Sequence, residues 1–434
     1  MQKKALFFYL LCSLGQLFAQ EATNCVVTQD IDNFWATYDQ LQTTKDSVAQ
    51  LEMLQAGFFD KGTEGLKLIG EARRYTAAEY LGAIRKYPLF WASVRENTLK
   101  AKTIGAEIEA GIAKFKKVYP ELKPAKVYFT IGALRTSGTA MNGQLLIGSE
   151  LAMADANTNS SEFVTRFSYL KPYFAGNPLQ NIVFLNIHEY VHTQQTAAWG
   201  YDLLSQSLFE GIAEFIPTVV LGQNSTTPAI EYGKKNEAKV KAAFEKEMFS
   251  PWFDRWVWND FNNEFKMRDL GYYIGYAIAE KYYLQAKDKQ LAIKELLAVD
   301  FNKSEAVEAF VEKTGYFTKP IKQLKKNFEK NRPTVIGIRE FKNGSKNVDP
   351  NITSITFHFS TPLNKCCQST DFGALGETYF PEILSKTFAE DGKSIIYQVK
   401  LKPNRKYQFV LERGFRSLQD IPLKPYIVEI TTKA

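Results

Sequence analysis

Histidine and cysteine, the side chains that most often bind metal ions, are scarce in this chain. Its 434 residues include three histidines and four cysteines. Four cysteines cannot supply a dense disulfide framework, and their spacing is not that of a zinc site. The net charge of +7 is too mild and too evenly spread to indicate a nucleic-acid partner. The remaining composition, with 45% hydrophobic residues, is that of a globular protein long enough for two or three domains.

Long apolar runs are also missing, apart from one at the N-terminus. Lys3 and Lys4 precede an apolar stretch that turns polar at Gln20, which is the pattern of a secretory signal peptide over residues 1–19. The stretch is shorter than the roughly 20 residues of a membrane span, so we expect no transmembrane anchor. Loss of the two lysines leaves a charge of +5 (7 − 2). We therefore expect a secreted, periplasmic or cell-surface protein.

The chain without its leader keeps three cysteines, which cannot all pair with one another. At most one disulfide is expected, and the candidate bridge joins Cys25 to Cys366 or Cys367.

Two of the three histidines, His188 and His192, stand one helical turn apart in the pentapeptide HEYVH. Residues four apart share a helix face, so both imidazoles can bind one Zn²⁺ ion. Glu189 lies beside them, where it can act as general base and acid; this is the HExxH arrangement. We expect Asn177-Pro178 to cap and begin this helix. The alternative is a pair of buried core histidines, which would need other hydrogen-bond partners.

A catalytic zinc ion needs a third protein ligand, and Glu210 is the candidate. It is expected to begin an apolar helix that returns antiparallel to the first, with Glu214 one turn later. The alternative is that Ser207 and Glu210 form a capping box, which would occupy the glutamate. The third histidine, His358, lies in a strand-like pattern near the C-terminus and is not expected to bind the metal.

With these residues in place, the chain resembles the gluzincins, zinc metallopeptidases whose third ligand is a glutamate on the helix after HExxH. Their second motif often reads Glu-Gly-x-Ala, as the segment EGIA from Glu210 does here. The resemblance implies Zn²⁺ held by His188, His192 and Glu210, and a peptide or protein substrate. It also implies that Glu214 orients a ligand histidine. The spacing from His192 to Glu210 is one or two residues shorter than in the best-known gluzincin families.

The segment RDLGYYIGYAIAEKYY offers tyrosines that could stabilise negative charge on a scissile carbonyl oxygen. In the M1-type aminopeptidase branch of the gluzincins, a tyrosine with this role is followed by glycine three positions on, as Tyr272 is by Gly275. Tyr273 and Tyr276 are the substitutes. The alternative is a stripe of core aromatics, with Gly271 and Gly275 allowing two helices to pack closely.

The order of patterns predicts an N-terminal helical region over residues 20–125 and a catalytic region over residues 126–331. Strand-like segments between residues 126 and 148 predict a small sheet. The resemblance implies that an edge strand of this sheet pairs with the substrate backbone. The segment GTAMN at 138–142 is similar to the GAMEN segment of the M1-type aminopeptidases but lacks its glutamate, which argues against an aminopeptidase.

Residues 333–434 contain short alternating strands that resemble bacterial Ig-like domains of secreted and surface proteins. Such a domain could bind a surface or protein partner. The predicted fold class is α+β, a mainly helical zincin-like catalytic region with a small sheet followed by an all-β Ig-like sandwich. The predicted function is that of a secreted zinc metallopeptidase. Two alternatives remain open, a non-peptidase zinc hydrolase and a non-catalytic or vestigial zinc-binding protein of envelope assembly or adhesion.

Overall fold

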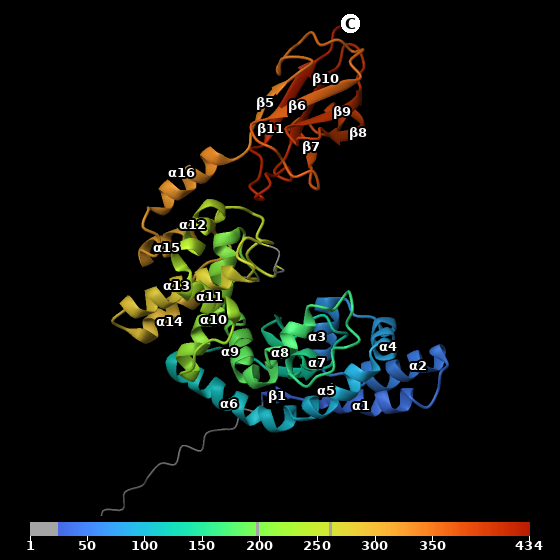
Figure 1. Cartoon of the computed structure of the whole chain (residues 1–434), viewed down its shortest axis with the longest axis vertical. Coiled ribbons are helices and arrows are strands. Elements are labelled where there is room, and N and C mark those ends of the chain that lie inside the picture. The colour runs from blue at the N-terminus through green and yellow to red at the C-terminus, as the bar shows by residue number, and fades with distance from the viewer. Residues whose placement is uncertain (1–24, 197–198, 260–262) are drawn as a thin grey trace, which may run out of the picture.

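The computed structural model describes residues 25–196, 199–259 and 263–434. The predicted signal peptide over residues 1–19 lies outside these residues. The chain is of mixed α and β structure, which confirms the α+β class: helices fill most of the chain up to residue 331, and strands dominate the rest. Figure 1 shows the C-terminal strands at one end of the molecule, joined to the helical part through α16 (Ile321–Asn331).

Side chains cap the start of α2, α3 and α4 in the helical stretch before β2. Thr76 and Glu79 form a capping box at the start of α4, and Pro88 occupies the first turn of α5. The elements of this stretch are α1 (Gln29–Leu41), α2 (Ser47–Leu54), the π-helical turn η1 (Gln55–Phe59), α3 (Glu64–Arg73), α4 (Ala77–Lys86), α5 (Pro88–Leu99) and α6 (Ala101–Val118).

A four-stranded sheet follows, in the order β1-β2-β4-β3. Its strands are β1 (Val26–Val27), β2 (Val127–Thr130), β3 (Gly138–Met141) and β4 (Gln144–Gly148). The first three in sheet order run parallel, and β3 is an antiparallel edge strand. Strands β3 and β4 form a hairpin, because Asn142 and Gly143 both adopt positive φ and reverse the chain between them. Because β1 pairs with β2, the residues before 125 share a sheet with those after it.

The HExxH pentapeptide lies on α9 (Ile182–His192), as expected for a buried helix. The expected start at Asn177-Pro178 is wrong. Asn177 has a left-handed backbone and no capping bond, and residues Pro178–Asn181 form a 3₁₀ turn, η2, before α9 begins. Two short helices, α7 (Ser149–Ala152) and α8 (Leu170–Ala175), lie between the sheet and this turn.

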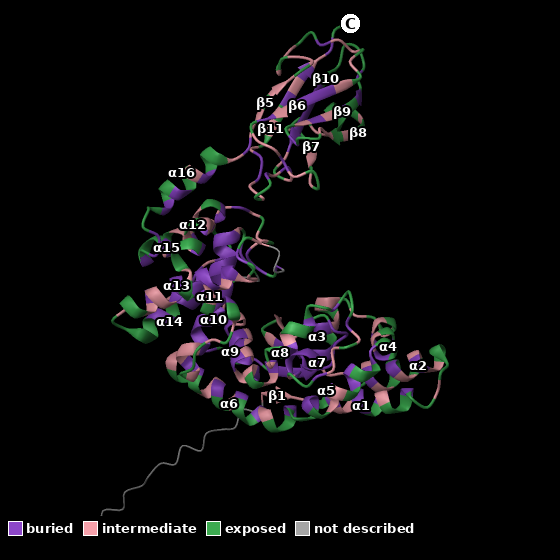
Figure 2. Ribbon diagram, in the orientation of Figure 1, coloured by how far each residue is buried: buried purple, intermediate pink, exposed green. Residues whose placement is uncertain are grey.

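The long helix α10 (Leu203–Leu221) packs against α9, and a second long helix, α13 (Leu270–Gln285), packs closely against α10. Glycine makes this possible: a Cβ atom added to Gly211 would lie 2.1 Å from the Gly275 carbonyl carbon, and one added to Gly275 would lie 1.8 Å from the Ser207 oxygen. The close helix packing expected from Gly271 and Gly275 is therefore observed, and it brings the start of α13 alongside Glu210 on α10. Figure 2 shows both helices largely buried.

The remaining helices cover this centre. They are α11 (Pro228–Lys235), α12 (Glu237–Glu247), α14 (Lys289–Leu297), α15 (Ser304–Thr314) and α16. One apolar core runs from Ile31 to Leu324 and includes residues of α1, the sheet, α9, α10 and α13. The division at residues 125 and 126 stays a prediction from the sequence.

The C-terminal part has its own core, from Val348 to Ile430, shared by two antiparallel sheets in the orders β5-β6-β9-β8 and β11-β10-β7. It contacts the helical part through Asp420, whose carbonyl accepts the Ser250 hydroxyl at 3.1 Å, and through Arg416, which lies over the Trp252 ring. The strands are β5 (Val335–Ile338), β6 (Ser354–Phe359), β7 (Thr370–Phe372), β8 (Glu382–Phe388), β9 (Ser394–Lys400), β10 (Lys406–Leu411) and β11 (Tyr426–Thr431).

The disulfide expected between Cys25 and Cys366 or Cys367 is wrong. The adjacent Cys366 and Cys367 bond to each other, while the Cys25 thiol lies beside the Glu109 carboxylate. Cys25 directly precedes β1, which Figure 1 shows at the opposite end of the molecule from the C-terminal strands. In the described parts of the chain, no helix has the length and apolar character to cross a membrane.

Candidate metal centre

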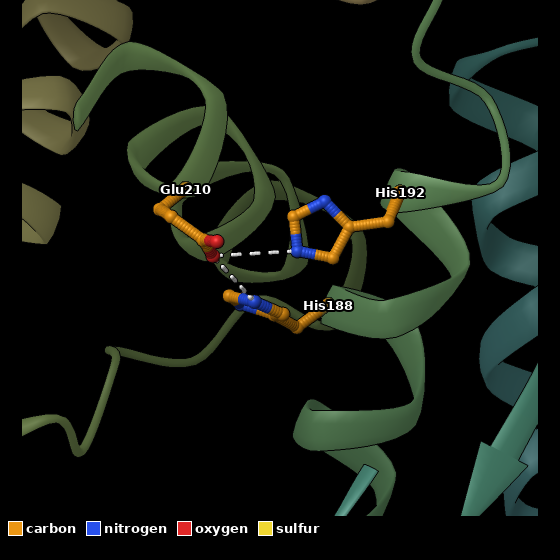
Figure 3. A group of neighbouring side chains, drawn as sticks. All are labelled: His188, His192 and Glu210. Atoms are coloured by element: carbon orange, nitrogen blue, oxygen red, sulfur yellow. Dashed lines mark ion pairs between the residues drawn. The ribbon is translucent and has the colours of Figure 1, made fainter. Parts of the chain in front are cut away.

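Three side chains from α9 and α10 converge on one point, as Figure 3 shows. Oε2 of Glu210 lies 3.7 Å from Nε2 of His188 and 3.4 Å from Nε2 of His192. The donor atoms of the three residues all lie within 4.8 Å of one another. His188 and Glu210 are buried, and His192 is nearly so. The structure therefore brings together the three residues that the sequence predicted as ligands.

Glu214 determines which nitrogen of His188 carries a proton. Its Oε2 lies 3.0 Å from Nδ1 of His188, and a carboxylate can only accept a hydrogen bond there. Nδ1 must therefore be the donor, and a neutral ring then directs the lone pair of Nε2 at Glu210. The other oxygen of Glu214 accepts hydrogen bonds from Ser225 and from Thr227, the latter at 2.7 Å. Glu214 thus occupies the orienting position that the sequence suggested.

His192 is oriented by a residue that the sequence did not reveal. Its Nδ1 lies 2.7 Å from Oε1 of Gln195, and the amide nitrogen of Gln195 donates to the backbone oxygen of Phe209 at 2.9 Å. This second bond orients the amide, so Gln195 presents an acceptor to His192. A neutral His192 ring then also directs its Nε2 lone pair at Glu210. The Phe209 ring stacks on the imidazole at 4.6 Å.

Glu210 is not engaged in a capping box. Helix α10 begins at Leu203 with Asp202 as its cap, so Glu210 lies in the helix interior and not in its first turn as expected. Its Oε1 accepts a hydrogen bond from Gln206 at 3.1 Å, which leaves Oε2 directed at the two imidazoles. The Gln206 amide oxygen in turn accepts the backbone N–H of Gly200 at 2.8 Å.

The donor set fits a divalent cation. The Nε2 lone pairs of the two neutral imidazoles face the carboxylate oxygen of Glu210. These groups repel one another unless a positive charge lies between them. Tetrahedral zinc bonds of about 2.0–2.1 Å to nitrogen would place neighbouring ligand atoms roughly 3.3 Å apart. The two distances of 3.4 and 3.7 Å to Glu210 are close to that separation.

The electrostatics of the pocket lead to the same conclusion. Burial by itself lowers the pKa of His188, but hydrogen bonds to Glu210 and Glu214 outweigh it and raise this pKa to about 10. Burial by itself raises the pKa of Glu210, but His192 and His188 outweigh it and hold this pKa well below its ordinary value. The pocket therefore stabilises positive charge, which a proton or a metal cation can supply.

Glu189 lies to the side of the three converging residues, against the edge strand of the sheet. A Cβ atom added to Gly138 of β3 would lie 3.3 Å from Oε1 of Glu189, so glycine leaves room for this carboxylate. Among the residues that the structure describes, Glu189 has no hydrogen-bond or ion-pair partner, although it is half-buried. Its carboxylate is therefore available to exchange a proton.

Only one of the three candidate tyrosines reaches the centre. The Tyr272 ring stacks on His188 with centroids 6.2 Å apart, and the charge of Glu210 acts on its hydroxyl. Tyr273 packs against Gly233, and Tyr276 lies against Phe215 and below Lys234.

Burial raises the pKa of Tyr272 well above its ordinary value, and Glu210 adds to the shift. Its hydroxyl therefore keeps its proton at neutral pH and can donate it in a hydrogen bond. The third histidine, His358, lies on β6 and pairs with Gly337 of β5, away from this site.

Comparison with known proteins gives no family for the chain. No protein-family model and no curated protein match it. Among solved structures, the S-layer protein rSbsC(31-844) is 13% identical over 65% of this chain and 44% of its own, with a TM-score of 0.18. The N-terminal part of the bacterial S-layer protein SbsC is 13% identical over 65% of this chain and 76% of its own, with a TM-score of 0.19.

The chain spans less than half of the first of these structures, at 44%. Similarity at this level carries no argument about fold or function.

Proposed function

We propose that this protein is a secreted zinc metallopeptidase of the gluzincin type, with an Ig-like sandwich at its C-terminus. The convergence of His188, His192 and Glu210 is the observation that carries the proposal. Each imidazole is oriented through Nδ1, by Glu214 or by Gln195, so that its Nε2 faces the same carboxylate oxygen. Oriented ligands of this kind are typical of metal sites.

The site favours catalysis over a purely structural metal. A bound Zn²⁺ ion would polarise a carbonyl group and make water more acidic. Glu189 has no partner among the described residues, so it can take a proton from the attacking water and pass it to the leaving amine as the C–N bond breaks. Tyr272 can donate its hydroxyl proton in a hydrogen bond to the carbonyl oxygen as negative charge develops there.

Strand β3 supplies a place for the substrate. It is an edge strand, so its outer backbone groups can pair with an extended peptide, and its first residue, Gly138, contacts Glu189. A peptide paired with β3 would therefore pass beside the general base. The edge strand therefore favours a peptidase over a zinc hydrolase of small esters or amides, which needs no such strand.

The test compares zinc content and cleavage of a mixed peptide library for the wild type, Glu189→Gln and His188→Ala. We expect Glu189→Gln to keep zinc and lose about 10²–10⁴-fold in turnover, because it removes proton transfer alone. His188→Ala should lose both. Glu231→Gln, the same change at an exposed carboxylate on α11, is the control and should match the wild type.

Two results would count against the proposal. Turnover that survives in Glu189→Gln would remove the general base. A wild type that binds zinc but cleaves no peptide would favour the non-catalytic interaction protein.

A further inference from the structure

Trp258 lies in the segment between α12 and α13, and its side chain is 55% exposed. Despite this exposure its indole nitrogen, Nε1, makes a hydrogen bond of 3.0 Å to the Tyr272 hydroxyl oxygen. The indole N–H can only donate, so the Tyr272 oxygen must be the acceptor in this bond. The bond therefore fixes the polarity of the tyrosine hydroxyl.

The Trp258 hydrogen bond also limits where the Tyr272 hydroxyl can direct its own proton. A phenol has one O–H donor. It cannot donate to Trp258, because the indole N–H on that side is itself a donor. Among the described residues, the Tyr272 ring stacks on the His188 imidazole, and the Glu210 carboxylate, which can only accept, is close enough to act on the hydroxyl. The Tyr272 proton is therefore directed into the centre, towards the side where a substrate carbonyl oxygen would gain negative charge.

The backbone that presents Trp258 is held in an unusual conformation. Trp258 has φ of 57° and Asp269 has φ of 60°, both in the left-handed region that bulky residues rarely adopt. The two strained residues are locked together, because the Trp258 N–H donates to Oδ1 of Asp269 at 2.7 Å. Oδ1 of Asn259 then accepts the Asp269 N–H at 2.7 Å. Such strain persists only where several contacts enforce it, and it concentrates at functional sites.

We propose that Trp258 is a positioning residue for Tyr272, which holds the hydroxyl as a donor aimed at the reacting carbonyl oxygen. The inference rests on the proposed peptidase function. It goes beyond that function because nothing in the HExxH and Glu210 motifs requires a tryptophan here. Trp258 acts through Tyr272 and need not touch the substrate.

The first experiment does not depend on turnover or on a metal. Indole N–H resonances are recorded by ¹H–¹⁵N NMR on the full chain treated with a chelator, and the Trp258 signal is assigned by its loss in Trp258→Phe. We expect this signal to move upfield in Tyr272→Phe, because the acceptor is removed. The signal of Trp199, which is 67% exposed and has no hydrogen bond to a tyrosine among the described residues, should stay in place. An unmoved Trp258 signal would overturn the inference whatever the enzyme does.

The second experiment measures steady-state kinetics of the zinc-loaded chain for Trp258→Phe, Tyr272→Phe and the double variant. We expect Trp258→Phe to lower kcat about tenfold, the effect of one hydrogen bond, and to leave KM within about twofold. In a Tyr272→Phe background it should cause no further loss. Trp252→Phe, a change at a neighbouring tryptophan that stacks under Arg416 and not on the site, is the matched control.

The outcomes separate the two proposals. Losses that add in the double variant, or a change confined to KM, would show that Trp258 acts independently of Tyr272. Absence of turnover in the wild type would overturn the proposed function, and with it the role of Trp258 in positioning Tyr272 for catalysis. A shifted Trp258 signal would then show only that the hydrogen bond exists.

Discussion

The helical part and the C-terminal sheets bury their polar groups in opposite ways. The helical part buries ionisable side chains, among them His188, Glu210, Glu214 and Glu150. The buried polar side chains of residues 333–434 are all uncharged: Thr356, Gln408, Ser417 and Thr432. Burial of a charge is costly unless it is paired, so a fold without a reaction to perform avoids it. The contrast supports the proposal that the chemistry lies in the helical part, and that the sheets serve packing and binding.

Removal of the metal should have the largest effect, because it should lower the stability of the helical part and leave that of the C-terminal sheets unchanged. Chelation of zinc from a chain loaded at 1,000 times its Kd should destabilise the helical part by about 4 kcal/mol, because the ion binds only the folded site. Tryptophan fluorescence reports this part alone, since all six tryptophans precede residue 333. Amide hydrogen exchange in β9 and β10 is the internal control and should not change. Equal destabilisation of both parts would contradict a site confined to α9 and α10.

Glu150 allows a test of buried charge away from the centre. It is fully buried on α7, and its oxygens accept the N–H groups of Gly132 at 2.8 Å and Leu134 at 3.1 Å. Burial raises its pKa from an ordinary 4.5 to about 7, although these bonds oppose the shift. The folded chain therefore binds this proton more tightly than the unfolded chain. Its contribution favours folding below pH 4.5 and is lost as the pH rises to about 7.

The expected result is a pH-dependent difference between Glu150→Gln and the wild type. Relative to the variant, the wild type should lose about 3 kcal/mol of unfolding free energy between pH 4.5 and 7. Denaturant unfolding followed at several pH values measures this difference. Glu121→Gln, at an exposed carboxylate paired with Lys294, should show no such slope. A flat difference for Glu150→Gln would mean that the carboxylate is not desolvated.

Glu214→Gln should produce the smallest effect, and it tests whether the residues that orient the histidines contribute to zinc affinity. The amide weakens the hydrogen bond to Nδ1 of His188, so zinc affinity should fall about 10–100-fold, the usual consequence of losing such a partner. Competition with a chromophoric chelator measures the affinity. Thr218→Val, one turn further along α10 and remote from the imidazoles, serves as the control. Unchanged affinity in Glu214→Gln would show that His188 needs no orientation from α10.

The centre could be predicted from the sequence where residues are related by helix geometry. His188 and His192 are one turn apart on α9, and Glu210 and Glu214 are one turn apart on α10. Such spacing places side chains on one face whatever the surrounding fold. The metal-binding role of these residues stays a prediction.

Local patterns failed where tertiary contacts decided the outcome. Asn177-Pro178 has the form of a helix start, yet α9 begins five residues after Asn177, at Ile182. Ser207 and Glu210 have the form of a capping box, yet Asp202 starts α10 earlier. Several start signals can compete along one segment, and packing selects among them.

No sequence pattern indicated the residues outside the helices that orient the side chains of the centre. Gln195 and Trp258 are tied to the centre by hydrogen bonds to His192 and Tyr272. Their positions depend on how loops close against α10 and α13, which one sequence does not reveal.

Zinc K-edge X-ray absorption on the zinc-loaded wild type tests the central claim most directly, because it reports the ligands themselves. The account predicts one Zn²⁺ per chain with two imidazole nitrogens and additional oxygen ligands at about 2.0–2.1 Å, and loss of the imidazole signal in His188→Ala. A zinc ion with sulfur ligands, or with oxygen ligands alone, would contradict it.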